Sequence, residues 1–373
     1  MAAPHLRETG KSLRPVLRTL LTFFAFAASA LAVEPRDISA AIEIVRAKYK
    51  LPACASAVVE DGRIIALGAT GLRRADRDVR VTIADIWHIG SCTKSMTAAL
   101  IGVLVDAGKL RWDMPVPDAL PGVPCDPGWR GVTIEHLVTQ RSGIAAMSSG
   151  EWRRLDPGTG TPREQRANFA QMVLAKPPAQ PPGKFSYSNS GYGLLGAILE
   201  HATGSSYEEL LRKHIFAPLH LTTAGFGAPA TPGKIDQPWG HYRNGDQLSP
   251  ASPLPENQYP PALAPAASVH MSLADFARYV AWISTGEPRL VKPETFAHLQ
   301  TPPEGSSYAG GLWKTELPGI GGEAVSHCGH MGGFFAVFHA GRRRACVTVF
   351  NTEGGGWEWL GDEIAAVALK AAQ

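Results

Sequence analysis

Segments with strand-like patterns lie near both ends of this 373-residue chain, and this distribution restricts its possible folds. Segments 54–59 and 63–68 are joined by Glu60-Asp61-Gly62, and Asp-Gly between two apolar runs is a strong β-hairpin signal. Further strand-like runs follow near the other end of the chain, at 310–315, 324–329, 333–340 and 344–351. Strands at both ends with helices between them predict one sheet, assembled from the two ends around a helical insertion.

Helical periodicity dominates the middle of the chain. The pattern predicts helices at 93–107, 133–140, 165–174, 190–203, 205–215 and 272–285. It also predicts helices at 37–50, with Asp37 as the N-cap, and at about 356–371. Residues 71–83 are polar and irregular. The proline-dense segments 177–182 and 249–265 are expected to be surface loops, because the helical pattern resumes after each of them.

Residues 1–32 have the composition of an export signal. Basic residues precede an apolar stretch from Leu20 to Leu31, and Ala30-Leu-Ala32 fits the small-x-small cleavage pattern. The apolar run is short for a membrane span, so we expect cleavage and a periplasmic or secreted protein, with an uncleaved anchor as the alternative. Without this segment the acidic and basic residues balance, which gives no indication of nucleic-acid or anionic-membrane binding.

The cysteines give no indication of a metal site. Their spacing contains no CxxC and no metal-ligand pattern with histidine; the five are Cys54, Cys92, Cys125, Cys328 and Cys346. Export would permit disulfides, but an odd count leaves at least one thiol free. We therefore expect buried small hydrophobic residues, and neither a metal nor a cofactor.

A serine three residues before a lysine is the first candidate catalytic feature. Residues i and i+3 share one face of a helix, so Ser91 and Lys94 can meet if Ser91 opens the helix. Serine needs a neighbouring base to become a nucleophile, and a lysine is such a base only if its pKa is lowered. The alternative is a helix N-cap followed by a solvated lysine. The small apolar residues that follow favour a buried helix, in which an unpaired lysine is costly.

Two further segments offer partners for Ser91. Tyr187 and Asn189 follow a Pro-Gly turn and, two residues apart in an extended segment, would point the same way. A phenol can relay a proton, and an amide can orient a lysine amine or a substrate carbonyl. A second Tyr-x-Asn, at Tyr242 and Asn244, precedes Gly245-Asp246, so we read it as part of a turn.

The third segment surrounds His327, where a strand ends in a glycine cluster that lets a ligand approach the backbone closely. His327 can interact with substrate or with the Tyr187 oxygen. The alternative is a histidine that is simply hydrogen-bonded at a strand end.

Together these segments, in this order and separation, resemble the penicillin-recognising serine hydrolases. That superfamily includes class C β-lactamases, DD-carboxypeptidases, D-aminopeptidases and β-lactamase-like esterases. Its pattern is Ser-x-x-Lys, then Tyr-x-Asn, then Lys- or His-x-Gly, and the matching pairs here are Ser91/Lys94, Tyr187/Asn189 and His327/Gly329. Supporting matches are Val105-Asp-Ala-Gly-Lys-Leu110, Thr133-Ile-Glu-His-Leu-Val138 and Gln140-Arg-Ser-Gly143. The likeness extends from about residue 37 to Asn351.

The resemblance implies an α/β (α+β) fold, in which an antiparallel sheet flanked by helices lies beside an all-helical domain. Residues of about 33–90 and 305–373 would form the sheet subdomain, and about 91–304 the helical one. Ser91 would attack an acyl carbon with help from Lys94 and Tyr187, while Asn189 and His327 complete the site. The resemblance also places the oxyanion between the backbone N–H groups of Ser91 and His330, beside Gly329.

Three positions depart from the common superfamily pattern, and two of them, Cys328 and His327, lower the expectation of efficient β-lactam hydrolysis. Gln140 replaces a common histidine, at a position that we interpret as structural. Cys328 replaces a hydroxyl that helps to bind a substrate carboxylate, and a thiol is a weaker donor. His327 replaces a lysine, as in some DD-carboxypeptidases and D-aminopeptidases. With an unperturbed pKa near 6.5, His327 would switch charge in an accessible pH range, and we favour a neutral relay for the Tyr187 proton.

These observations predict a serine hydrolase that forms an acyl-enzyme on an amide or peptide bond, of DD-carboxypeptidase or D-aminopeptidase type. One alternative is an esterase for small acyl esters, or a weak β-lactamase, with the same chemistry. The other is a binding protein that kept the fold without catalysis. The expected partner is a small-molecule or peptide substrate, and the sequence leaves the oligomeric state open.

Overall fold

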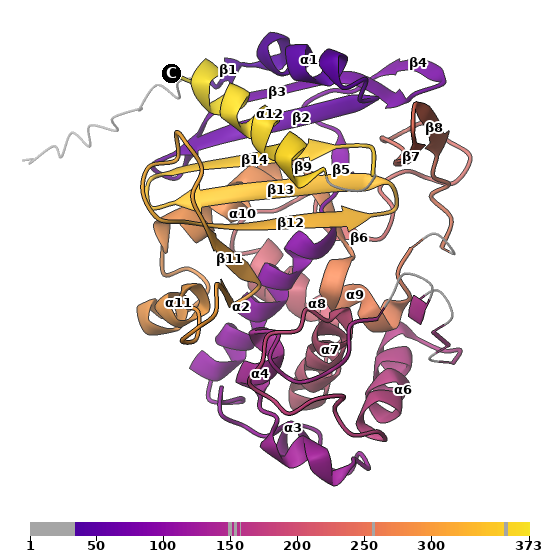
Figure 1. Ribbon diagram of the computed structural model, residues 1–373, viewed down its shortest axis with the longest axis vertical. Helices are drawn as coiled ribbons and strands as arrows, with labels where there is room; N and C mark the ends of the chain where they lie inside the picture. The colour runs from indigo at the N-terminus through magenta and orange to yellow at the C-terminus, as the bar shows by residue number, and fades with distance from the viewer. Residues whose placement is uncertain (1–33, 148–150, 153–154, 157, 256–257, 354–356) are drawn as a thin grey trace, which may run out of the picture. The chain divides into compact units, whose positions relative to one another are not determined.

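In the computed structural model, strands from both ends of the chain form one sheet (Figure 1). The structure describes residues 34–147, 151–152, 155–156, 158–255, 258–353 and 357–373, and the expected signal, residues 1–32, lies outside them. Within the described residues the sheet has nine strands, in the order β1-β3-β2-β14-β13-β12-β11-β10 with β4 paired to β3. β2 pairs with β14 in antiparallel register, with Ser56 opposite Thr348. The expected assembly of the sheet from both ends of the chain is therefore confirmed.

All neighbouring strands of this sheet are antiparallel except β1 and β3. The strands near the start are β1 (Arg36–Asp37), β2 (Ala53–Glu60), β3 (Arg63–Arg74) and β4 (Arg77–Arg80). Those near the end are β10 (Tyr308–Ala309), β11 (Leu312–Thr315), β12 (Ala324–Met331), β13 (Phe334–Gly341) and β14 (Arg344–Phe350). Asp61 and Gly62 turn β2 into β3 with positive φ at both residues, as the Asp-Gly signal predicted.

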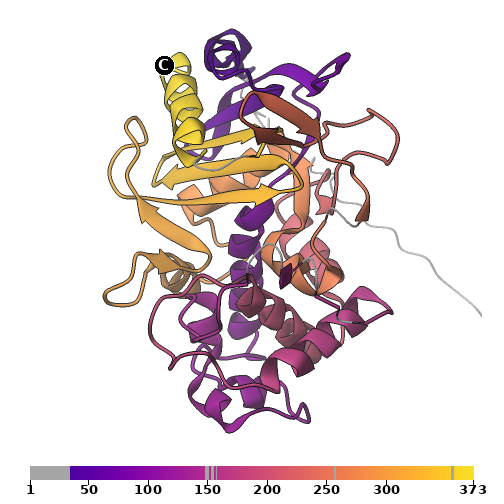
Figure 2. The same cartoon turned by 45° about the vertical axis from the view of Figure 1, so that its right-hand side comes forward.

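Helices cover both faces of the sheet. α1 (Ser39–Lys48) and α12 (Glu358–Ala371) lie on one face, as Figures 1 and 2 show, and α10 (Leu273–Thr285) packs on the other. On β13, Phe335 and Val337 belong to the core beneath α1 and α12, whereas Ala336 and Phe338 belong to the core on the opposite side. This alternation follows from the two-residue period of a strand, and explains why β13 is buried along its whole length.

The helical part surrounds α2 (Thr93–Asp106), most of whose residues are buried. Its other helices are α3 (Val116–Ala119), α4 (Ile134–Val138), α6 (Pro162–Leu174), α7 (Asn189–Thr203), α8 (Tyr207–Leu211), α9 (Ala264–Ala267) and α11 (Pro293–Gln300). α6 begins with a capping box between Thr161 and Glu164, and α7 ends at Gly204, which adopts the left-handed conformation. Short segments complete the part: 3₁₀ turns η1 (Gly90–Cys92), η2 (Pro127–Gly131) and η5 (Pro261–Leu263), and the π-helical turn η3 (Arg212–Phe216).

In the part of the chain that the structure describes, two small sheets lie outside the main one. The first joins β5 (Ile86–His88), β9 (Val269–Ser272) and β6 (Gly225–Phe226), and the second is the hairpin of β7 (His241–Asn244) and β8 (Gln247–Pro250). The expected turn at Gly245-Asp246 connects β7 to β8.

The structure corrects three local expectations. Residues 71–83 are not wholly irregular, because β3 continues to Arg74 and pairs with β4. Part of the proline-dense segment 249–265 is buried: Leu263 is fully covered at the end of η5, next to α9. Proline is compatible with the first turn of a helix, so proline density alone does not indicate exposure. The N-cap of α1 is Ile38, although the Asp37 carboxylate still accepts a hydrogen bond from the Ser39 N–H.

The five cysteines are free thiols. Cys54, Cys92 and Cys346 are buried as expected, while Cys125 and Cys328 are partly exposed. Among the described residues, no helix combines the length and the hydropathy needed to cross a bilayer.

Candidate active site

The start of α2 places Ser91 and Lys94 together. Ser91 lies in η1, and Lys94 is in the first turn of α2, so their side chains share one face. The Nζ of Lys94 lies 3.0 Å from the Oγ of Ser91. Gly90 has a φ of 51°, and a Cβ atom there would lie 2.6 Å from the backbone nitrogen of His330. Glycine therefore permits η1 to lie directly against β12.

Lys94 is fully buried and has three hydrogen-bond partners. Besides Ser91, its Nζ contacts the Oδ1 of Asn189 at 2.7 Å and the backbone oxygen of Ala266 at 2.9 Å. Burial lowers the pKa of Lys94 from 10.5 to about 7, because desolvation disfavours the ammonium. The Asn189 and Ala266 oxygens can only accept, so a neutral amine donates to both and directs its lone pair at Ser91. This arrangement makes Lys94 suited to accept the Ser91 proton.

Tyr187 and Asn189 both reach this site. Tyr187 lies in the loop before α7, and Asn189 is the first residue of α7, one residue before the expected start at Ser190. The Nδ2 of Asn189 donates to the hydroxyl of Tyr259 at 3.0 Å, which directs its Oδ1 towards Lys94. Burial raises the pKa of Tyr187 well above 10, an effect that a hydrogen bond with Ser91 only partly offsets. At neutral pH Tyr187 is therefore a phenol rather than a phenolate.

Gln140 positions the segment that carries these two residues. Its backbone oxygen accepts from the Ser186 N–H and its Oε1 accepts from the Ser188 N–H, both at 2.8 Å. These two hydrogen bonds agree with the interpretation of Gln140 as a residue that supports the structure rather than the reaction.

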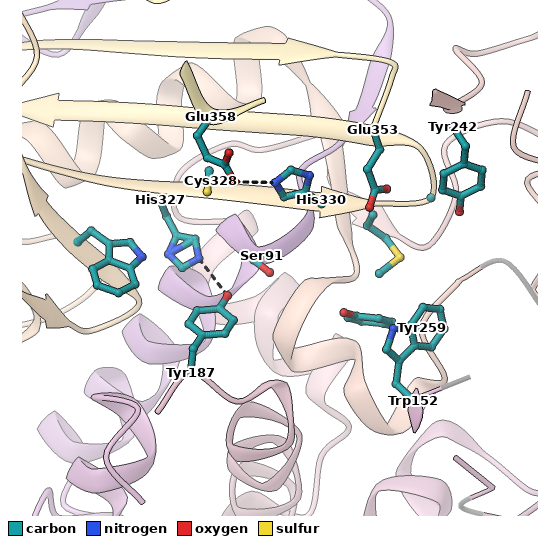
Figure 3. A pocket seen from close by; sticks show the side chains of 13 residues that line it. Ser91, Trp152, Tyr187, Tyr242, Tyr259, His327, Cys328, His330, Glu353 and Glu358 are labelled. Carbon is teal, nitrogen blue, oxygen red and sulfur yellow. Dashed lines mark hydrogen bonds and ion pairs between the residues drawn. The ribbon is translucent and has the colours of Figure 1, made fainter. Parts of the chain in front are cut away.

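His327 is buried between two hydrogen-bond partners. Its Nδ1 lies 2.9 Å from the backbone oxygen of Gly311, which can only accept, so Nδ1 carries the proton. The Nε2 lies 3.4 Å from the Tyr187 oxygen and is left to accept from the phenol (Figure 3). Burial, and then the charge of Lys94, lower the pKa of His327 to about 3. The expectation that His327 switches charge near pH 6.5 is therefore wrong, because the imidazole is desolvated.

Gly329 lies at the contact between β12 and η1. A Cβ atom at Gly329 would lie 2.5 Å from the backbone nitrogen of Ser91. Gly90 in turn lies against the backbone of His330. The backbone N–H groups of Ser91 and His330 therefore lie close together, where η1 contacts β12. These are the two groups expected to receive an oxyanion.

A cavity of about 420 Å³ opens beside Ser91, Tyr187 and His327. β11 pairs with β12 only from Ala324 to Ser326, so the edge of β12 beyond Ser326 is left beside this cavity. An extended substrate can therefore reach both the backbone of β12 and the Ser91 hydroxyl. Figure 3 shows the lining side chains around this opening.

Several lining residues were missed by sequence reasoning, namely Trp152, Tyr259, Trp313, Glu353 and Glu358. They come from distant segments and share no motif, so no local signal could identify them. Tyr242 also lines the cavity. The sequence reading assigned Tyr242 to a turn and not to the site. The turn at Gly245-Asp246 is present, but Tyr242 itself lies on β7 and its side chain reaches the cavity.

Comparisons with known proteins agree with this geometry. The family model described as "Beta-lactamase" matches residues 38–372. Penicillin-binding protein 4 of Amycolatopsis lactamdurans is 37% identical over 182 residues, which cover 48% of this chain and 46% of that protein. The chain spans about half the length of the curated relatives it matches.

Solved structures show the same fold. The octameric penicillin-binding protein homologue from Pyrococcus abyssi has a TM-score of 0.71 and 25% identity, covering 88% of this chain and 76% of that one. The D-amino acid amidase from Ochrobactrum anthropi SV3 has a TM-score of 0.70 and 20% identity, covering 89% of this chain and 97% of that one. With the family model matching nearly all of the described chain, this protein belongs to the beta-lactamase family, within the superfamily of penicillin-recognising serine hydrolases.

Proposed function

We propose that this protein hydrolyses an amide or peptide bond through an acyl-enzyme on Ser91. The observation that carries the proposal is the buried Lys94 amine, 3.0 Å from the Ser91 hydroxyl and with a pKa of about 7. At neutral pH a large fraction of this amine is unprotonated and faces the nucleophile. A buried lysine held only for structure would not need its lone pair directed at a serine.

The acylation step uses each neighbouring group once. Ser91 Oγ forms a bond to the acyl carbon while its proton passes to Lys94. The backbone N–H groups of Ser91 and His330 receive the developing oxyanion, and one such donor typically contributes about 3–4 kcal/mol to transition-state stabilisation. As the carbon–nitrogen bond breaks, Tyr187 gives its proton to the leaving nitrogen, and the Lys94 ammonium replaces that proton. Water then attacks the Ser91 ester and releases the acid.

The charge of the cavity favours an ammonium on the substrate over a carboxylate. Glu353 lines the cavity, and its carboxylate attracts a cation. His327, at the position where many relatives use a lysine, has a pKa of about 3 and is neutral, so it supplies no positive charge for a carboxylate. Of the two peptidase types predicted from the sequence, we therefore favour the D-aminopeptidase or amidase type over the DD-carboxypeptidase type.

Aromatic walls support the same preference. Trp152 and Tyr259 meet edge to face, with ring centroids 4.5 Å apart, and Tyr242 lies on the same side of the cavity as Glu353 (Figure 3). Aromatic rings beside a carboxylate suit a substrate with an apolar side chain and an ammonium group.

A matched substrate panel tests this proposal. D-amino acid amides with a free amine should have a higher kcat/KM than their N-acetyl counterparts, which lack the charge. Their kcat/KM should also be higher than that of D-Ala-D-Ala peptides blocked at the amine and that of a chromogenic cephalosporin. Glu353→Gln should reduce the preference for the free amine by about 10-fold or more, since it removes a charge facing the cavity. Faster turnover of the carboxylate-bearing substrates would contradict the assignment.

The esterase alternative uses the same acyl-enzyme chemistry, so p-nitrophenyl esters belong in the same panel. A binding protein without catalysis would leave Ser91 unmodified by all of these substrates.

A further inference from the structure

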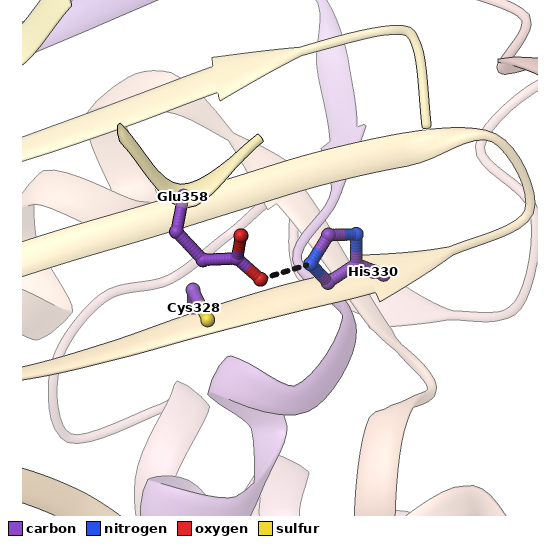
Figure 4. A group of neighbouring side chains, drawn as sticks. All are labelled: Cys328, His330 and Glu358. Carbon is purple, nitrogen blue, oxygen red and sulfur yellow. Dashed lines mark ion pairs between the residues drawn. The ribbon is translucent and has the colours of Figure 1, made fainter. Parts of the chain in front are cut away.

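Three side chains with different donor atoms meet at the rim of the cavity, on the opposite side of β12 from His327. Cys328 Sγ, one His330 ring nitrogen and one Glu358 oxygen all lie within 4.8 Å of one another (Figure 4). The Nε2 of His330 and the Oε1 of Glu358 are 3.6 Å apart. The proposed reaction uses none of these three side chains, since His330 contributes only its backbone N–H.

The fold explains why these residues meet. Cys328 and His330 are two residues apart on β12, so their side chains lie on the same face of the strand. α12 covers this face, and Glu358 lies in its first turn. The ring of His330 packs edge to face on Phe335, the residue opposite it on β13, with ring centroids 4.8 Å apart. This contact holds the imidazole in place before any ligand binds.

The spacing of the donor atoms fits a transition-metal ion. Zinc binds imidazole nitrogen and carboxylate oxygen at about 2.0–2.2 Å and thiolate sulfur at about 2.3 Å, in a tetrahedron whose ligand atoms lie roughly 3.3–3.6 Å apart. The His330–Glu358 separation of 3.6 Å already matches one edge. The separations that involve the Cys328 sulfur are no more than 4.8 Å, so small side-chain shifts bring all three atoms to these spacings. A thiolate, an imidazole and a carboxylate together suit Zn²⁺ better than Mg²⁺ or Ca²⁺.

We propose that Cys328, His330 and Glu358 bind one Zn²⁺ ion at the rim of the substrate cavity. Three protein ligands leave the fourth position of the tetrahedron open, and all three residues line the same cavity as Ser91. The ion replaces the thiol proton of Cys328, because the thiolate is the form of cysteine that binds zinc. The ion takes no part in the proton transfers of Ser91 and Lys94.

The spacing of residues along the sequence does not identify this site. A Cys-x-His pair on a strand places two ligands on one face, but the third ligand is supplied by α12, almost thirty positions further along the chain. Only the packing of α12 on β13 and β14 brings it close.

Metal binding by the purified full chain tests the proposal. After chelator treatment and buffer exchange, Zn²⁺ is titrated in competition with a chromogenic chelator, and Co²⁺ is added separately as a spectroscopic probe. We expect one ion per chain, and a thiolate-to-cobalt charge-transfer band. Cys328→Ser should abolish the band, and Glu358→Gln should weaken Zn²⁺ binding by about 10-fold or more.

Matched variants separate this site from other ligands. Cys125→Ser removes the other partly exposed thiol, and Glu363→Gln changes a carboxylate on α12 that pairs with Lys48 instead. Both should bind Zn²⁺ as the wild type does. Ser91→Ala should also bind normally, so the result is independent of the proposed hydrolase activity. Equal binding by Cys328→Ser, Glu358→Gln and wild type, each with an unchanged melting temperature, would overturn the proposal, and so would the absence of a stoichiometric site.

Discussion

Replacing Asn189 by aspartate should move the pH dependence of acylation without removing the side chain. In the wild type, the pKa of about 7 for Lys94 predicts that kcat/KM rises with pH through about 7 and then levels off, because the neutral amine is the base. An unshifted lysine with a pKa of 10.5 would be neutral in only about one molecule in 3,000 at pH 7. Burial thus increases the fraction of usable base by roughly three orders of magnitude.

The structure gives the size of the expected change. Asn189→Asp places a carboxylate where the amide oxygen lies, 2.7 Å from the Lys94 Nζ. At an effective dielectric constant of 20, two unit charges at that distance attract by roughly 6 kcal/mol. Desolvation of the carboxylate opposes part of this, and the remainder should raise the pKa of Lys94 by about two units or more. Activity at pH 7 should therefore fall about 100-fold and recover at alkaline pH.

The assay is the pH profile of kcat/KM for a neutral amide substrate, which reports on groups of the free enzyme. Asn244→Asp is the matched control, because Asn244 belongs to the second Tyr-x-Asn pattern, is exposed, and lies on β7. Its profile should match that of the wild type. A uniform loss for Asn189→Asp at every pH, with no shift of the acidic limb, would show that Lys94 is not the base.

The remaining predictions concern the contact between η1 and β12, the role of His327 and the N-terminus. Gly90→Ala should lower acylation strongly, since the added Cβ would meet β12, whereas Gly108→Ala, which also has positive φ but open space around it, should keep wild-type rates. His327→Ala should lower kcat/KM by about 10–100-fold through loss of the acceptor for Tyr187, and His327→Gln should recover part of it; equal losses would exclude that role. N-terminal sequencing should show that the exported protein begins near Val33, and an intact leader would contradict this. Treatment with a chelator should not abolish hydrolysis, and activity that returns only when metal is added would contradict that expectation.

Short-range chemistry made much of the fold predictable. The Asp61-Gly62 turn and the periodicity of α2, α7 and α10 placed these elements within a few residues of their observed bounds. β3 was cut short at Gly68 because its continuation carries glycine and arginine instead of alternating apolar residues. Its pairing with β4 is decided by the neighbouring strand rather than by local propensity.

The candidate site was predictable where a motif holds its residues and not beyond. Ser91 and Lys94 share a helix face, so their approach follows from spacing alone. The Ala266 oxygen on Lys94 could not be anticipated, because a backbone carbonyl has no sequence signature. The lowering of the His327 pKa likewise follows from burial of the imidazole, which only the tertiary structure determines.

Covalent modification of Ser91 tests the central claim most directly. The protein is incubated with an activated ester, and with a free-amine D-amino acid ester, then quenched and digested, and any adduct is mapped by peptide mass spectrometry. We predict one acyl group per chain on Ser91, with no adduct and at least a 1,000-fold loss of turnover (roughly 4 kcal/mol) in Ser91→Ala. An adduct on another residue, such as Cys328, together with full activity of Ser91→Ala, would contradict the account.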